Sequence, residues 1–151
     1  MKLHSVKKIE GMTLMELLVT LAIMVILAFI GVPSYQQFVE NERFAVATNE
    51  LYKAYRFARN EAIKTSTPMT LEANPGGWAN GWSVKDSSAN VLFVSKKPRA
   101  GITVSGASIT VFGRGALSGG NAAFSISSSS KARYLCVLSS GQSILQDGNC
   151  P

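Results

Sequence analysis

Residues 12–32 form a continuous apolar run in which Glu16 is the only charged residue. As an α-helix rising about 1.5 Å per residue, this run would be roughly 31 Å long, which matches the bilayer core of about 30 Å. The preceding residues include Lys2, Lys7 and Lys8, and basic residues favour the cytoplasmic side of a membrane. The sequence therefore predicts a single membrane-spanning helix with a cytoplasmic N-terminus and the rest of the chain on the far side.

The apolar run differs from a secretory signal peptide, which is cut behind its apolar part at a small-x-small site. Residues 29–33 offer no clear site of that kind, whereas Gly11 stands directly before the run. A carboxylate inside such a run costs roughly 2.5 to 3.5 kcal/mol on insertion scales, so Glu16 is expected to have a partner. Any processing is therefore predicted in front of the helix rather than behind it.

Residues 7–18 read Lys-Lys-Ile-Glu-Gly-Met-Thr-Leu-Met-Glu-Leu-Leu. They resemble the class III signal of type IV prepilins and type II secretion pseudopilins, in which a basic leader ends in glycine and a glutamate is fifth in the mature chain. The resemblance implies that a prepilin peptidase removes residues 1–11 by cutting between Gly11 and Met12, and that Met12 is then N-methylated. The family more often has phenylalanine where this chain has Met12.

The resemblance also suggests a role for Glu16 in assembly. After cleavage Met12 carries an ammonium group, and the carboxylate of one subunit beside the ammonium group of its neighbour would neutralise two charges that are costly to bury. A simpler interpretation is that Glu16 only suits the dipole at the helix N-terminus and reaches toward the headgroups. The flanking motif favours the pairing role.

Beyond Pro33 the helical pattern continues to about Lys64 and becomes amphipathic. The sequence predicts one helix of about 50 residues, with residues 12–33 in the membrane or filament core and residues 34–64 against a sheet. Gly31 and Pro33 predict a kink, because proline removes an intrahelical hydrogen bond. The apolar residues of the second half recur every three to four positions: Phe44, Ala47, Leu51, Ala54, Tyr55, Ala58 and Ala62.

From residue 65 to residue 151 the composition shifts toward Gly, Ser, Thr and β-branched residues in short runs separated by turn residues. A helix followed by strands is typical of an α+β fold, in which an antiparallel β head packs on the amphipathic half of the helix. The predicted strands are residues 69–73, 82–85, 91–95, 102–105, 108–112, 123–127, 134–138 and 142–145.

Residues 76–86 contain the segment Trp-Ala-Asn-Gly-Trp, which resembles the tryptophan–glycine–tryptophan segment of the GspH/FimT branch of minor pilins and pseudopilins. Together with the N-terminal motif, the resemblance covers nearly the whole chain. It implies a type IV pilin-like fold, with a long N-terminal helix packed on a C-terminal antiparallel β-sheet head. Trp78 and Trp82 are expected to pack in or at the edge of the core rather than to bind carbohydrate.

Cys136 and Cys150 are the only cysteines, and both would lie on the exported side, where thiols oxidise. We predict a disulfide between them that closes a C-terminal loop. Two free thiols or half of a metal site are the alternatives. Zinc is disfavoured because the mature chain would contain only two thiols and would lose the sole histidine, His4, with the leader.

No catalytic arrangement is evident. Without a histidine the mature chain cannot form a Ser-His-Asp or Cys-His site, and its acidic residues are scattered rather than paired for hydrolysis. We therefore predict a structural protein with no catalytic residues, no metal and no cofactor, which is itself a substrate of the prepilin peptidase.

Three exported roles remain open. The favoured one is a minor type IV pilin of the FimU kind, which starts in the inner membrane with a periplasmic head and is incorporated at or near the pilus tip. There it would help to prime assembly and would contact other minor pilins and the major pilin. The alternatives are a GspH-type pseudopilin among the other pseudopilins of a type II secretion system, or a FimT-like DNA-binding pilin for natural transformation.

DNA is the disfavoured partner. Loss of residues 1–11 leaves a side-chain charge of only +4, since three lysines and one glutamate leave with the leader. The DNA-receptor branch typically carries Gly-Arg-x-Arg near its C-terminus, whereas residues 141–144 here read Gly-Gln-Ser-Ile. The candidate phosphate-binding residues would be Lys96, Lys97, Arg99, Arg114, Lys131 and Arg133.

We predict that Gly11→Val blocks maturation, because a branched side chain would crowd the predicted scissile bond. The measurement is a blot of cells that contain the prepilin peptidase, in which the variant should run only at the size of the uncut chain. A mature-sized band for the variant would contradict the predicted cleavage site.

Overall fold

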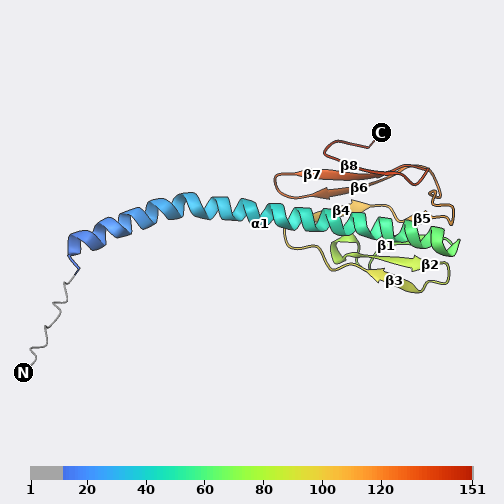
Figure 1. Cartoon of the computed structure of the whole chain (residues 1–151), viewed down its shortest axis with the longest axis horizontal. Coiled ribbons are helices and arrows are strands. Elements are labelled where there is room, and N and C mark those ends of the chain that lie inside the picture. The colour runs from blue at the N-terminus through green and yellow to red at the C-terminus, as the bar shows by residue number, and fades with distance from the viewer. Residues whose placement is uncertain (1–11, 151) are drawn as a thin grey trace, which may run out of the picture. The chain divides into compact units, whose positions relative to one another are not determined.

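The computed structural model describes residues 12–150 (Figure 1). One helix, α1 (Leu14–Thr65), is followed by eight strands and a short 3-10 helix. The chain divides into two units, Met1–Phe38 and Val39–Pro151, so that α1 contributes to both. The predicted leader, including Gly11, lies outside the described residues.

The first unit contains the N-terminal part of α1. Thr13 precedes the helix, and its Oγ1 accepts a hydrogen bond of 3.2 Å from the backbone N–H of Glu16, which is the bond of an N-cap. The helix continues through Gly31 and Pro33, and Ser34 Oγ donates to the carbonyl of Ile30 at 3.0 Å. Proline therefore does not end α1, and the kink at this place stays a prediction.

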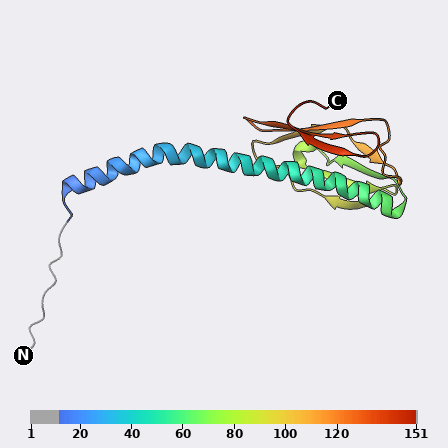
Figure 2. The ribbon, with the colours of Figure 1, turned by 45° about the horizontal axis from the view of Figure 1, so that its top comes forward.

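The second unit, which we call the head, contains the rest of α1 and two antiparallel sheets (Figures 1 and 2). The first sheet has the order β3-β2-β1-β5 and the second the order β4-β6-β7-β8. The 3-10 helix η1 (Trp78–Asn80) precedes β2. The strands are β1 (Met69–Ala73), β2 (Trp82–Asp86), β3 (Val91–Val94), β4 (Thr103–Gly106), β5 (Ile109–Val111), β6 (Ala122–Ser127), β7 (Ala132–Val137) and β8 (Ser143–Gln146).

All eight strands lie within two residues of their predicted bounds, and the α+β order is confirmed. The strands form two sheets instead of one, because β4 pairs with β6 while β5 returns to pair with β1. Gly106, the last residue of β4, allows a close approach there: a Cβ at this position would lie 2.3 Å from a ring carbon of Phe124. The chain changes sheets directly after it.

The core of the head lies between the amphipathic face of α1 and the two sheets. All seven predicted apolar positions of the helix are buried. Three of them are alanines one turn apart, Ala54, Ala58 and Ala62, and their small side chains let the sheets pack close to the helix. The partners of this face include Leu71 and Val84 in the first sheet and Phe124, Ile126 and Leu135 in the second.

Both tryptophans pack within the head, as expected. Trp82 is buried in the core, and the half-buried Trp78 lies 6.2 Å from it and 5.3 Å from Phe124, measured between ring centroids. The indole N–H of Trp78 donates to the carbonyl of Gly106 at 2.8 Å. Trp78 therefore holds the end of β4 against the core.

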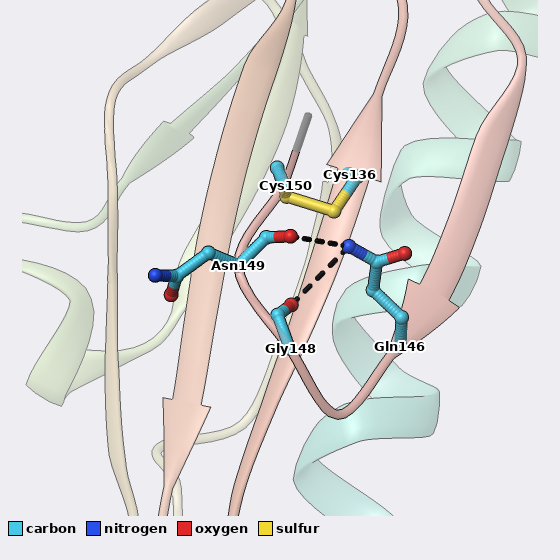
Figure 3. Close-up of a disulfide and its surroundings, with 5 residues drawn as sticks. All are labelled: Cys136, Gln146, Gly148, Asn149 and Cys150. Atoms are coloured by element: carbon cyan, nitrogen blue, oxygen red, sulfur yellow. Dashed lines mark hydrogen bonds between the residues drawn. A yellow bond between two sulfur atoms is a disulfide. The ribbon is translucent and has the colours of Figure 1, made fainter.

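The predicted disulfide between Cys136 and Cys150 is present and joins β7 to the C-terminal tail (Figure 3). In the same tail the amide of Gln146 donates to the carbonyls of Gly148, at 3.2 Å, and Asn149, at 2.6 Å. The covalent bond joins the tail to β7, and the two hydrogen bonds stabilise the turn between β8 and Cys150.

We predict that the double substitution Cys136→Ser and Cys150→Ser lowers the free energy of unfolding of the head by about 3 kcal/mol, the value that the loop-entropy model gives for a loop of this size. Urea unfolding of residues 39–151 measures it. A reductant should destabilise the wild type to the same extent and leave the variant unchanged. Equal stability of the oxidised wild type and the variant would contradict this prediction.

Candidate functional site

The first candidate surface is the apolar part of α1. Among the described residues, α1 is the one helix that is long and apolar enough to cross a membrane. Every residue from 12 to 38 is exposed, and large side chains such as Phe29, 78% exposed, contact little else among residues 12–150. A continuous apolar surface of this extent requires lipid or other protein around it.

Glu16 is the only charged residue in this surface. Its backbone N–H bonds to the Thr13 hydroxyl, but no donor among residues 12–150 reaches its carboxylate. The position fits the first turn of a helix, where a negative charge is favourable, and the Thr-x-x-Glu spacing is that of a capping box. The carboxylate therefore remains available to a cation from outside the described chain.

An apolar depression lies on the same helix, around Pro33. It has a volume of about 530 Å³ and is lined by Val25, Ala28, Phe29, Val32 and Pro33. Ala28 leaves space between larger neighbours, so the depression has the size and chemistry to receive apolar side chains of an adjacent helix.

The six predicted DNA-binding cations fall into two groups of three, those with contacts inside the head and those that line a pocket. Three of them already make contacts within the head: Arg114 stacks on Phe112 at 5.0 Å, Lys131 donates to Asn41 at 2.7 Å, and Arg133 pairs with Asp147 at 2.7 Å.

The other three predicted cations, Lys96, Lys97 and Arg99, lie in the loop between β3 and β4 and are exposed. They line a pocket of about 230 Å³ together with Arg43 and Trp82, among others. Three of the predicted cations thus have partners within the head, and the other three form one exposed basic group.

A second polar pocket, of about 480 Å³, lies where α1 faces the turn between β7 and β8. It brings Arg56 and Arg59 beside residues 141–144. Arg59 Nε donates to the carbonyl of Gly115 at 3.2 Å, and the Tyr55 hydroxyl donates to the carbonyl of Gly141 at 2.6 Å. Desolvation by burial raises the pKa of Tyr55 above its ordinary value.

Sequence analysis missed Arg43, Arg56 and Arg59 as site residues. The spacing of Arg56 and Arg59, three residues apart on the helix, indicates one flank of α1, but it does not identify the turn that this flank faces. Arg43 could not be linked to residues 96–99, which are more than fifty positions away in the sequence.

Glu40 connects α1 to the turn between β6 and β7. Its carboxylate accepts hydrogen bonds from the hydroxyls of Ser129, at 2.8 Å, and Ser130, at 3.0 Å. The bond from Ser129, followed by those from its serine neighbours, lowers the pKa of the Glu40 carboxyl below its ordinary value of 4.5. The serine run therefore has a structural use, as an anchor to the first turns of the helix in the head.

No cluster of three or more His, Cys, Asp or Glu side chains that could hold a metal ion occurs among residues 12–150. The polar groups described above are donors, single carboxylates and hydroxyls. Their arrangement supports binding and packing.

The chain matches a family model described as Type II transport protein GspH over residues 47–141. No curated protein sequence matches it significantly. Two crystal structures of the type IV minor pilin FimU of Pseudomonas aeruginosa (strain PAO1) are similar to it. One is 22% identical and covers 72% of this chain and 92% of that chain, with a TM-score of 0.61. The other is 19% identical and covers 68% of this chain and 91% of that chain, with a TM-score of 0.54. The similarity shows that the fold is that of a type IV pilin.

We predict that Glu40→Gln removes an acid-sensitive part of the stability of the head. Because the pKa of Glu40 is lowered in the folded state, its contribution is present above about pH 4.5 and is lost as the pH falls through the folded pKa. Urea unfolding of residues 39–151 at several pH values should show wild type and variant differing near neutral pH and converging in acid. Glu42→Gln, on the same helix, should follow the wild type. Identical profiles for Glu40→Gln and wild type would contradict the anchor.

Proposed function

The chain belongs to the GspH family, and from this membership we propose that it is a minor pilin of the FimU kind, incorporated at or near the tip of a type IV pilus. The family model covers well over half of the chain, and the fold is that of a pilin. It is a structural protein rather than an enzyme. In this role it would help to prime assembly and would contact other minor pilins and the major pilin.

The observation that carries this proposal is the exposed apolar surface of residues 12–38 with its single carboxylate. An apolar helix of this length supports anchoring in a membrane and, after extraction, burial among the helices of other pilins. Its depression at Val25, Ala28 and Phe29 would receive side chains of a neighbouring helix. The same surface thus serves two successive environments.

Processing by the prepilin peptidase is part of the proposal. Cleavage between Gly11 and Met12 would leave an ammonium group four residues before Glu16. The carboxylate of Glu16, which meets no donor among the described residues, would accept the ammonium group of an adjacent subunit. Pairing would favour assembly only in one axial register, since an unpaired buried charge costs several kcal/mol.

We propose a location in the inner membrane before assembly, with residues 1–11 in the cytoplasm and the head in the periplasm. The basic leader supports this orientation, and the disulfide of the head suits an oxidising compartment. Assembly would then transfer the chain from the membrane to the filament.

The second candidate is a minor pseudopilin of a type II secretion system, which the description of the family model favours. Adjacent genes for a pilus adhesin and other minor pilins would support the pilus, and a secretin-linked secretion operon would support the pseudopilus. DNA uptake is less favoured, because Arg114, Lys131 and Arg133 already have partners inside the head.

We predict that Glu16→Ala leaves the head folded and lowers the amount of this protein in sheared filaments by about tenfold or more, since the neighbour's ammonium group would be buried without a partner. The measurement is a blot of the filament fraction against total membranes. Glu16→Gln should behave like Glu16→Ala. It retains a polar side chain, but it loses the charge that the pairing needs.

The matched control is Glu42→Gln, which removes a negative charge from the same helix outside the apolar segment. It should be incorporated like the wild type. Normal incorporation of both Glu16 variants would remove the pairing mechanism.

A further inference from the structure

The pocket of about 230 Å³ beside the loop between β3 and β4, which we call the Trp82 pocket, has an unusual set of polar groups. Two of its side chains, Trp82 and Arg43, carry buried N–H groups that find no acceptor among residues 12–150. The full lining is Arg43, Val46, Ala47, Glu50, Trp82, Lys96, Lys97, Pro98 and Arg99.

The unpaired donors are well defined. Trp82 is 1% exposed, and its backbone N–H bonds to Ser95 Oγ at 2.8 Å, but its indole Nε1 has no hydrogen-bond partner. Arg43 donates from Nη1 to the carbonyl of Ala100 at 3.3 Å, whereas its Nε is buried and unpaired. A buried donor without an acceptor costs about 1 to 3 kcal/mol, so an acceptor that hydrogen-bonded to these two N–H groups would be stabilised there.

The charged side chains that line the pocket indicate which kind of acceptor suits the two unpaired N–H groups. Arg43, Lys96, Lys97 and Arg99 provide donors only, and Glu50 is the single acid in the lining. The Glu50 carboxylate lies 3.9 Å from Lys53 Nζ, which offsets its charge in part. The pocket therefore favours an oxyanion, and a cation or a neutral donor would leave the N–H groups unpaired.

We propose that the Trp82 pocket binds a carboxylate side chain of an adjacent protein subunit. The identity of the partner rests on the proposed function, whereas the affinity for a carboxylate rests on the pocket alone. A carboxylate has two oxygens and about four lone-pair sites, so it can accept from the indole, the guanidinium and a lysine together.

A carboxylate fits better than the phosphodiester of a nucleic acid. The donor of Trp82 is buried, so a group that approaches it must be narrow, and the tip of one side chain is narrower than a phosphate flanked by two sugars. Val46, Ala47 and Pro98 give the pocket apolar walls, which suit the methylene groups of a glutamate or aspartate. Glu50 at the same pocket disfavours a polyanion more than a single negative charge.

The two tryptophans provide an internal control for the test. The chain has two, and the Trp78 indole already donates to Gly106. In the full-length protein in detergent micelles, labelled with ¹⁵N-tryptophan, acetate replaces chloride at constant ionic strength. We expect a saturable shift of the Trp82 indole resonance, assigned by its loss in Trp82→Phe, and little change at Trp78.

Matched variants identify the cations that act. Lys97→Gln, at an exposed position, should weaken the apparent affinity for acetate several-fold, and Arg43→Gln should weaken it about tenfold, as expected for a charge-assisted hydrogen bond. Lys64→Gln, on the same helix outside the pocket, should not change it. Equal responses to acetate and chloride, or equal shifts of both indoles, would overturn the carboxylate site.

Two further measurements test the partner. A short duplex DNA that displaces acetate from Trp82, with the same dependence on Lys97, would overturn the protein partner in favour of a nucleic acid. In cells, Lys97→Gln with Arg99→Gln should lower recovery in sheared filaments several-fold relative to Lys64→Gln. Equal recovery of the two, with wild-type protein in the filament, would overturn the partner. Absence of the wild-type protein from filaments would contradict the proposed function and leave the acetate titration intact.

Discussion

The burial of the apolar surface of α1 is the constraint on which the rest of this chain depends. In the head, the face from Phe44 to Ala62 is covered by the chain's own two sheets. Residues 12–38 have no such cover among the described residues. The covered face of the helix therefore stabilises the head. The exposed residues 12–38 make the chain dependent on lipid or on other subunits.

Local sequence patterns were enough to predict α1, the eight strands, the packing of Trp78 and Trp82 and the disulfide. The helix and the strands depend on short-range signals, such as the spacing of Phe44, Ala47 and Leu51 or the turn residues between strands, whereas the disulfide was predicted because the chain has only two cysteines. The division into two sheets could not be predicted, because it depends on which strand β4 and β5 select, a choice between partners far apart in the sequence. The hydrogen bonds that the serine turn donates to Glu40 could not be predicted for the same reason, since about ninety residues separate the two.

The candidate sites show the same limit more sharply. The sequence identified six cations of the head but not their partners. A cation that pairs with Asp147 or stacks on Phe112 cannot be distinguished, from sequence, from a cation without a partner. Only the strand order brings residues 96–99 to Arg43 and Trp82. The motif around Gly11, Met12 and Glu16 could be found from sequence because all its parts are contiguous. Their roles in processing and assembly remain predictions.

Apolar burial and charge pairing make different contributions to an assembly of such chains. Burial of residues 12–38 among other helices would supply a strong but non-directional attraction, which does not by itself select one axial position. If Glu16 pairs as proposed, its single carboxylate would select a position, because every wrong register would leave a charge unpaired. A carboxylate on the head of an adjacent subunit, hydrogen-bonded to Trp82 and Arg43, would select that neighbour in the same manner. A partner that lacks this carboxylate would leave two buried donors unsatisfied. Strength would then come from the helix, while register and partner choice would come from a few polar groups.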